Sequence, residues 1–151
     1  MKNHQIIFEE IKVLLIQLFG SDLNKHDEDT HLAIGDTGVW ISADEEDLTI
    51  GSGMNHRHYH SKYDDISEAI DEFFNLLTCE KRITKYFKGE FNYKIKTEIA
   101  NKNGEFKELS TSMTWLYPFW KKTKTKIETE QKLVDFKVIE KEYLKIKAMA
   151  S

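Results

Sequence analysis

One segment, residues 66–77, has the clearest periodicity in the chain and limits the folds that are possible. Its apolar residues recur with the spacing of one helix face: Ile66, Ala69, Ile70, Phe73, Phe74 and Leu77. Asp65 precedes the run and Glu68 follows three positions later, which is the pattern of a helix N-cap with its reciprocal partner. The sequence therefore predicts an amphipathic helix whose two phenylalanines are buried.

A second helix is predicted at the N-terminus, where five residues share one helical face: Ile7, Ile11, Leu14, Leu15 and Leu18. Gly20 follows in the position that commonly ends a helix. A signal peptide is the competing interpretation, but Glu9, Glu10 and Lys12 interrupt the apolar run and no small-residue cleavage site follows. Residues 13–19 are also too few to span a bilayer. We therefore expect an amphipathic helix of a cytoplasmic protein.

Between the two helices, apolar and polar residues alternate as they do in strands. Residues 32–34 and 48–50 carry this pattern and residues 39–41 form a β-prone run, so we expect two or three antiparallel strands joined by tight turns. Gly51 and Gly53 follow, and glycines inside a strand predict a bulge or a bend.

The C-terminal half carries further strand patterns. Residues 91–99 and 109–115 alternate on either side of Asn103-Gly104, a pair typical of a tight hairpin turn. Residues 123–129 alternate lysines and glutamates with threonine and isoleucine, which indicates an edge strand protected by charge. Residues 133–148 also allow a helix.

The predicted order is α-β-β-α-β-β-β with a further C-terminal helix allowed, and no βαβ alternation is visible. This order favours an α+β fold, with one mainly antiparallel sheet of about five to six strands and two or three helices on one face. The length of 151 residues suits a single domain over 1–151.

Composition narrows the classes of partner. The net charge of −4 argues against a nucleic-acid partner, which usually requires a basic surface. Cys79 is the single cysteine, so an internal disulfide is excluded and a reducing compartment is favoured. We predict no membrane association.

Three of the six histidines alternate in the segment GSGMNHRHYHSK, residues 51–62. In a strand, His56, His58 and His60 would point to the same side, with neighbours about 6.6 Å apart. A pair such as His56 and His58 could chelate one metal ion, but zinc needs a third or fourth ligand. The spacing selects none of the candidates, which are His31, Asp64, Asp65 and Cys79. We therefore predict no native metal site and no cofactor, and we assign no catalytic residue.

Two other interpretations of this segment are open. The histidines could form the polar end of a strand, bonded to backbone groups or to one another. Alternatively, the segment and the following helix start could form a recognition surface, because tyrosine and arginine are enriched at interfaces. That surface would comprise His56, Arg57, His58, Tyr59, His60, Asp64 and Asp65.

Other segments show weaker signals. Cys79 lies in no motif of a reactive thiol and is expected to be structural. The aromatic cluster near residue 118 is expected to divide between a core and an interface, and its large side chains are Trp115, Leu116, Phe119 and Trp120.

A pattern within residues 38–77 resembles small bacterial proteins found beside polymorphic or contact-dependent toxins. The residues that carry it are Trp40, Leu48, Thr49, Gly51, Gly53, His56, His58 and Tyr59, with residues 111–123 as a weaker second part. The resemblance implies an immunity-like protein that binds and masks a toxin domain. The net charge of −4 would suit a basic toxin domain. A metal- or histidine-dependent enzyme centred on His56, His58 and His60 is the alternative, and a structural homodimer is a third hypothesis.

Overall fold

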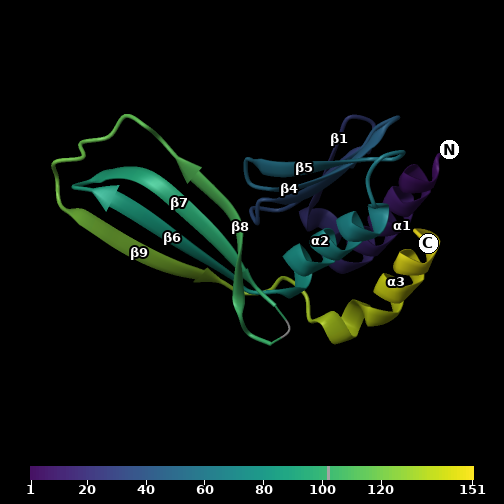
Figure 1. Cartoon of the computed structure of the whole chain (residues 1–151). Coiled ribbons are helices and arrows are strands. Elements are labelled where there is room, and N and C mark those ends of the chain that lie inside the picture. Colours follow the sequence, from purple (N-terminus) through teal and green to yellow (C-terminus); the bar gives the residue numbers. More distant parts are fainter. Residues whose placement is uncertain (102) are drawn as a thin grey trace. The chain divides into compact units, whose positions relative to one another are not determined.

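The computed structural model describes residues 1–101 and 103–151, and these contain three α-helices and nine strands (Figure 1). All strand pairs are antiparallel, so the predicted α+β class is confirmed. The strands form two sheets of five and four strands rather than one. The chain divides into two compact units, which we describe separately: unit 1 is Met1–Leu77 with Val134–Ser151, and unit 2 is Thr78–Leu133.

The sheet of unit 1 is a meander in which each strand pairs with the next along the chain. Its strands are β1 (Leu23–His26), β2 (His31–Ile34), β3 (Val39–Ala43), β4 (Asp47–Ser52) and β5 (Asn55–His60). Short turns connect them, as predicted. Residues 31–60 form four strands rather than the two or three predicted, because Gly53 lies in a turn between β4 and β5 and not in a bulge or bend within one strand. The residues that point toward the helices are apolar and buried, among them Leu32, Ile41, Leu48 and Ile50.

Three helices belong to unit 1: α1 (Asn3–Phe19), α2 (Ile66–Thr78) and α3 (Phe136–Met149). The predicted end of α1 is confirmed, because Gly20 has a φ of 51°, in the left-handed region that favours glycine. The carboxylate of Asp65 accepts a hydrogen bond of 2.8 Å from the N–H of Ser67, and this caps α2. A short 3₁₀ turn, Gly20–Asp22, leads from α1 into β1.

The helices cover one face of the five-stranded sheet (Figure 1). Phe73 and Phe74 on α2 are buried, as predicted. Phe74 of α2 contacts Tyr143 of α3 with ring centroids 5.2 Å apart. The Tyr143 hydroxyl donates to Asp71 at 2.6 Å, so α3 is joined to α2 by both apolar and polar contacts.

Unit 2 consists of strands and loops over its described residues. Its strands are β6 (Lys81–Lys88), β7 (Phe91–Ala100), β8 (Phe106–Met113) and β9 (Thr123–Glu130), in the order β8-β7-β6-β9. The predicted hairpin turn is confirmed, since the N–H of Gly104 donates to the carbonyl of Asn101 at 3.0 Å and Gly104 has a φ of 79°. β9 lies at an edge of the sheet, as its charge pattern predicted.

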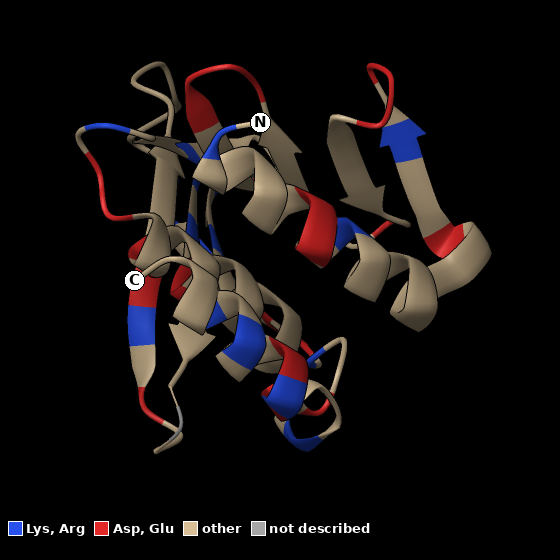
Figure 2. Ribbon diagram, turned by 90° about the vertical axis from the view of Figure 1, so that its right-hand side faces the viewer, with Lys and Arg blue, Asp and Glu red and all other residues tan. Residues whose placement is uncertain are grey.

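The two units differ in net charge, and Figure 2 marks lysine and arginine in blue and aspartate and glutamate in red. Unit 1 carries 9 lysine and arginine residues and 19 aspartate and glutamate residues, whereas unit 2 carries 13 and 7. The formal net charges are therefore −10 and +6, which together give the −4 of the whole chain. No helix in the described ranges has the length and apolar character that crossing a bilayer requires.

Candidate binding surfaces

The face of the five-stranded sheet opposite the helices gathers most of the histidines. In an antiparallel sheet, residues directly opposite each other share a face. His26 lies opposite His31, and Gly51 lies between Trp40 and His56. We call this surface the histidine face, and its ring-bearing residues are His26, His31, Trp40, His56, His58 and His60.

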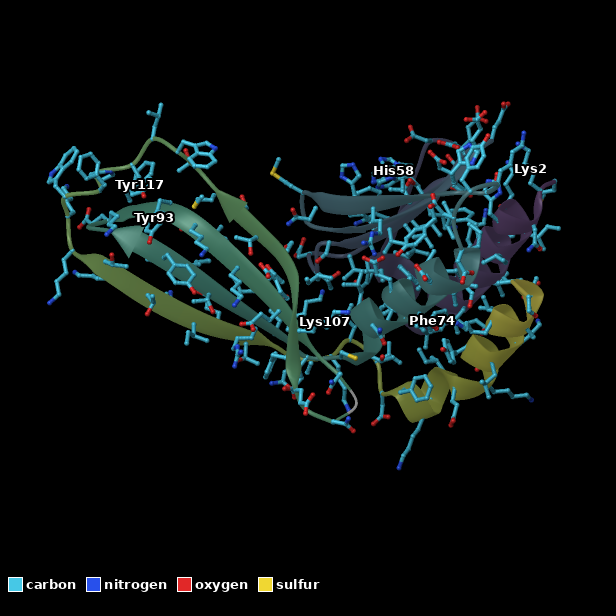
Figure 3. All side chains as sticks on the ribbon, in the orientation of Figure 1. Lys2, His58, Phe74, Tyr93, Lys107 and Tyr117 are labelled. Carbon is cyan, nitrogen blue, oxygen red and sulfur yellow. The ribbon has the colours of Figure 1, made fainter. Side chains whose placement is uncertain are left out.

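The rings of the histidine face form a continuous row across the sheet. His31 stacks on Trp40 with centroids 4.9 Å apart, and His26 lies 5.8 Å from His31. On the other side, Trp40 lies 5.9 Å from His56, which contacts His58 edge-on at 4.9 Å. Figure 3 shows His58 on the side of the sheet away from α2. The row contains rings from β1, β2, β3 and β5. His26 and His58, its two ends, are 32 positions apart in the sequence.

Gly51 makes this arrangement possible because the indole of Trp40 lies directly over it. A Cβ atom at Gly51 would be 1.9 Å from Cε2 of Trp40. The indole is held in place by a hydrogen bond of 3.0 Å from its Nε1 to the carbonyl of Gly53. Glycine at position 51 therefore leaves room for the indole of Trp40 to lie against the backbone. Gly53 has a different role: it has a φ of 62° and lies in the turn into β5.

Acidic residues border the histidine face where β3 turns into β4. Nε2 of His60 lies 3.7 Å from Glu46, and Nδ1 of His58 lies 4.0 Å from Asp47 and 2.8 Å from the hydroxyl of Thr49. Hydrogen bonds from the backbone N–H groups of Asp47 and Glu46 lower the pKa of Asp44, so its carboxylate stays ionised within the turn. This border gives the face a negative edge.

Arg57 and Tyr59 lie on the opposite face from the three histidines of β5. The side chain of Tyr59 is only 4% exposed, and its hydroxyl donates to the carboxylate of Glu72 on α2. Burial, together with this hydrogen bond, raises the pKa of Tyr59 to about 12. Nη1 of Arg57 lies 3.8 Å from Glu72. The residues predicted as one recognition surface are thus divided between two faces of the sheet.

Asp64 and Asp65, the acidic residues of the predicted surface, both make local structural contacts. The carboxylate of Asp64 accepts a hydrogen bond of 2.7 Å from the N–H of His60, and Asp65 caps α2. These contacts fix the path of the chain from β5 into the helix.

The described residues include no group of three or more His, Cys, Asp or Glu side chains that could hold a metal ion. His31, one of the candidate ligands, stacks on Trp40. Cys79 is half-buried, with Sγ 3.8 Å from the hydroxyl of Thr78. The absence of native zinc stays a prediction for elemental analysis.

A second surface lies in unit 2, in the connection between β8 and β9. We call residues 114–122 the aromatic loop. Its four large apolar side chains are between 73% and 87% exposed, and they are Trp115, Leu116, Phe119 and Trp120. The expectation that some of them lie in a core is wrong, because all four are exposed. Their place at an interface stays a prediction. The signal in the sequence is Pro118, which interrupts a regular helix or strand among these residues.

The aromatic loop is anchored although its tip is exposed. Tyr117 stacks on Tyr93 of β7 with centroids 4.5 Å apart (Figure 3). The N–H of Thr114 donates to the carbonyl of Tyr93 at 2.9 Å, and the N–H of Lys121 donates to the carbonyl of Pro118 at 3.0 Å. The loop therefore has a defined backbone path, with its large side chains facing solvent.

Comparison with known proteins finds no matching family model, no matching curated protein and no matching solved structure. The function must accordingly be inferred from the two surfaces themselves.

Proposed function

We propose that this chain is a non-enzymatic protein-binding module that presents the aromatic loop to its partner. The observation that supports the proposal is the exposure of four large apolar side chains within six residues, Trp115 to Trp120. Proteins rarely leave such a contiguous apolar patch in water unless another molecule covers it.

The chemistry of the loop agrees with a protein-binding role. Tryptophan is among the residues that most often dominate binding energy, because a large rigid ring buries much area for little lost entropy. The stacking of Tyr117 on Tyr93 limits the motion of the loop before binding. A pre-ordered loop loses less conformational entropy when a partner docks.

The histidine face is a second recognition surface within the same proposal. It combines aromatic rings with the acidic border at Glu46 and Asp47 in a unit of net charge −10. Such a charge would attract a basic protein and accelerate its approach. Because Tyr59 is buried, it can contribute little to contact with a partner. We therefore assign the contacts on this surface to the histidines.

The narrower hypothesis is that the module is a cytoplasmic immunity protein that masks a basic toxin domain. It is supported by the resemblance of residues 38–77 and by the acidic charge of unit 1. The alternative is a metal- or histidine-dependent enzyme centred on His56, His58 and His60, and its metal-dependent form is not supported, because the described residues include no group of three or more potential ligands.

The test is co-expression with a toxin domain encoded beside the gene, followed by calorimetric titration of the purified pair. Trp115→Ala/Trp120→Ala should weaken binding at least about 30-fold, the loss of one hot-spot residue or more. Leu144→Ala is the matched control, since it removes an apolar side chain of α3 that is also exposed. Unchanged affinity in the loop variant, with a large loss in His56→Ala/His58→Ala, would move the interface to the histidine face.

A further inference from the structure

We infer that β9 pairs with β9 of a second copy of this chain, antiparallel and centred on Ile127, so that two four-stranded sheets join into one. This inference is independent of the proposed function, because it concerns an edge strand rather than the aromatic loop or the histidine face.

The first observation is that β9 has an open edge. It pairs with β6 along its whole length, from Thr123 opposite Lys88 to Glu130 opposite Lys81. In the described part of the chain, no strand pairs with its other edge. An eight-residue edge of this kind presents a row of main-chain donors and acceptors that another strand can use.

The second observation is the order of charges along β9. Lys124 and Lys126 precede Ile127, and Glu128 and Glu130 follow it at the same distances. An antiparallel pair with Ile127 opposite itself places Lys126 opposite Glu128 of the second copy. Lys124 then lies opposite Glu130 of the second copy, and two-fold symmetry repeats both pairs. Opposite charges at directly opposed positions stabilise an antiparallel pair.

The charge order also selects the register. Sliding one copy by two residues would place Lys126 opposite Lys126, or Glu128 opposite Glu128, and like charges in these positions destabilise a sheet. All four charged side chains lie on one face of the strand, because side chains alternate along it. Centring on Ile127 is therefore the register in which every lysine meets a glutamate.

The third observation is the centre of the strand. Ile127 is 62% exposed in a single copy, and pairing would bring the two Ile127 side chains side by side. Thr125 lies opposite Thr129 of the second copy in the same register, and β-branched residues favour strands. An edge that charge merely protects has no need of an exposed isoleucine at the position of the proposed two-fold axis.

Existing ion pairs are compatible with this arrangement. Within one copy, Glu128 lies 3.2 Å from Lys126 and 3.5 Å from Lys85. Lys126 can turn toward Glu128 of the second copy while Lys85 continues to neutralise its own Glu128. The gain from each exposed charge pair is modest, so a dimer with a concentration-dependent population is expected.

Sedimentation velocity of the full chain over a range of concentrations tests the inference. Lys126→Glu and Glu128→Lys should each weaken dimerisation at least about tenfold, because each places like charges at two symmetric positions. The double variant Lys126→Glu/Glu128→Lys should recover most of the loss, since its charges are exchanged but still opposite. Lys107→Glu, on the opposite edge strand β8 (Figure 3), is the control and should leave dimerisation unchanged.

A second measurement uses mixed chains, and it remains informative if a single variant folds poorly. The variant Lys124→Glu/Lys126→Glu should form heterodimers with Glu128→Lys/Glu130→Lys, while each alone stays monomeric. A wild-type chain that is monomeric at every concentration would overturn the inference. So would a dimer that both single variants leave intact, or a double variant no better than the single ones.

Discussion

Replacing Gly51 by alanine should expel the indole of Trp40 from the histidine face. The new Cβ would lie 1.9 Å from Cε2 and 2.2 Å from Nε1 of Trp40, far inside van der Waals contact. The backbone at Gly51 lies outside the left-handed region, so alanine itself is compatible with the strand. The cost of the substitution therefore comes from the displaced ring.

The size of the effect follows from the contacts that Trp40 loses. Its hydrogen bond to the carbonyl of Gly53, 3.0 Å long, contributes about 0.5–1.5 kcal/mol. Its stacking on His31 at 4.9 Å contributes a similar amount, by analogy with other aromatic pairs. The free energy of unfolding should therefore fall by about 1–3 kcal/mol.

Urea denaturation followed by circular dichroism measures this free energy, and Trp40→Ala provides the comparison. If the indole is the cause, Gly51→Ala in the Trp40→Ala background should cost less than about 0.5 kcal/mol, because the two positions are strongly coupled. An equal loss in both backgrounds would refute the reasoning and place the cost in the backbone of β4.

Three further predictions concern the core, the tyrosines and metal content. Phe73→Ala should lower the free energy of unfolding by about 3–5 kcal/mol, because the ring is fully buried; a thermal melt close to that of wild type would mean that the packing of α2 is assigned wrongly. Burial raises the pKa of Tyr59 and of Tyr143 to about 12 in the folded chain. Since both values lie above the ordinary 10.0, their contribution to stability is complete below pH 10 and is lost as the pH rises through 12. An ultraviolet titration should show two tyrosines ionising late, and only one in Tyr59→Phe. Elemental analysis should find no stoichiometric zinc, whereas one zinc per chain that disappears in His56→Ala/His58→Ala would favour the enzyme hypothesis.

The helices and most strands of unit 1 were predictable because local chemistry and burial agree there. α2 combines an N-cap at Asp65 with an unbroken apolar face. β1 and β6 were missed for the same reason. β1 contains only one buried residue, Leu23, and β6 belongs to a sheet whose residues are mostly half-exposed, so neither carries a clear two-residue period. Without β6, the second sheet could not be recognised as separate.

The histidine face was predictable only in part. The alternation of His56, His58 and His60 correctly placed them on one side of a strand. The same alternation places Arg57 and Tyr59 on the other side of the strand. The predicted recognition surface wrongly combined them with the histidines because they are neighbours in the sequence. The contributions of His26, His31 and Trp40 depend on strand register across several turns, and spacing within one segment carries no information about that register.

The division of the chain into two compact units does not by itself test the single domain predicted over 1–151, which stays a prediction. Unit 1 has a helix-covered core, whereas unit 2 is a four-stranded sheet with few fully buried residues. A small sheet of this kind depends on further contacts for stability. The β9 pairing proposed above would supply such contacts by extending the sheet.

Hydrogen exchange of the chain, with and without its proposed protein partner, tests the central claim most directly. Because the aromatic loop is proposed to be covered in the complex, the amides of residues 114–122 should become the most strongly protected on binding. Slower exchange along β5 would show that the histidine face also contacts the partner. An unchanged exchange rate throughout residues 114–122, in a complex that protects other segments, would contradict the account.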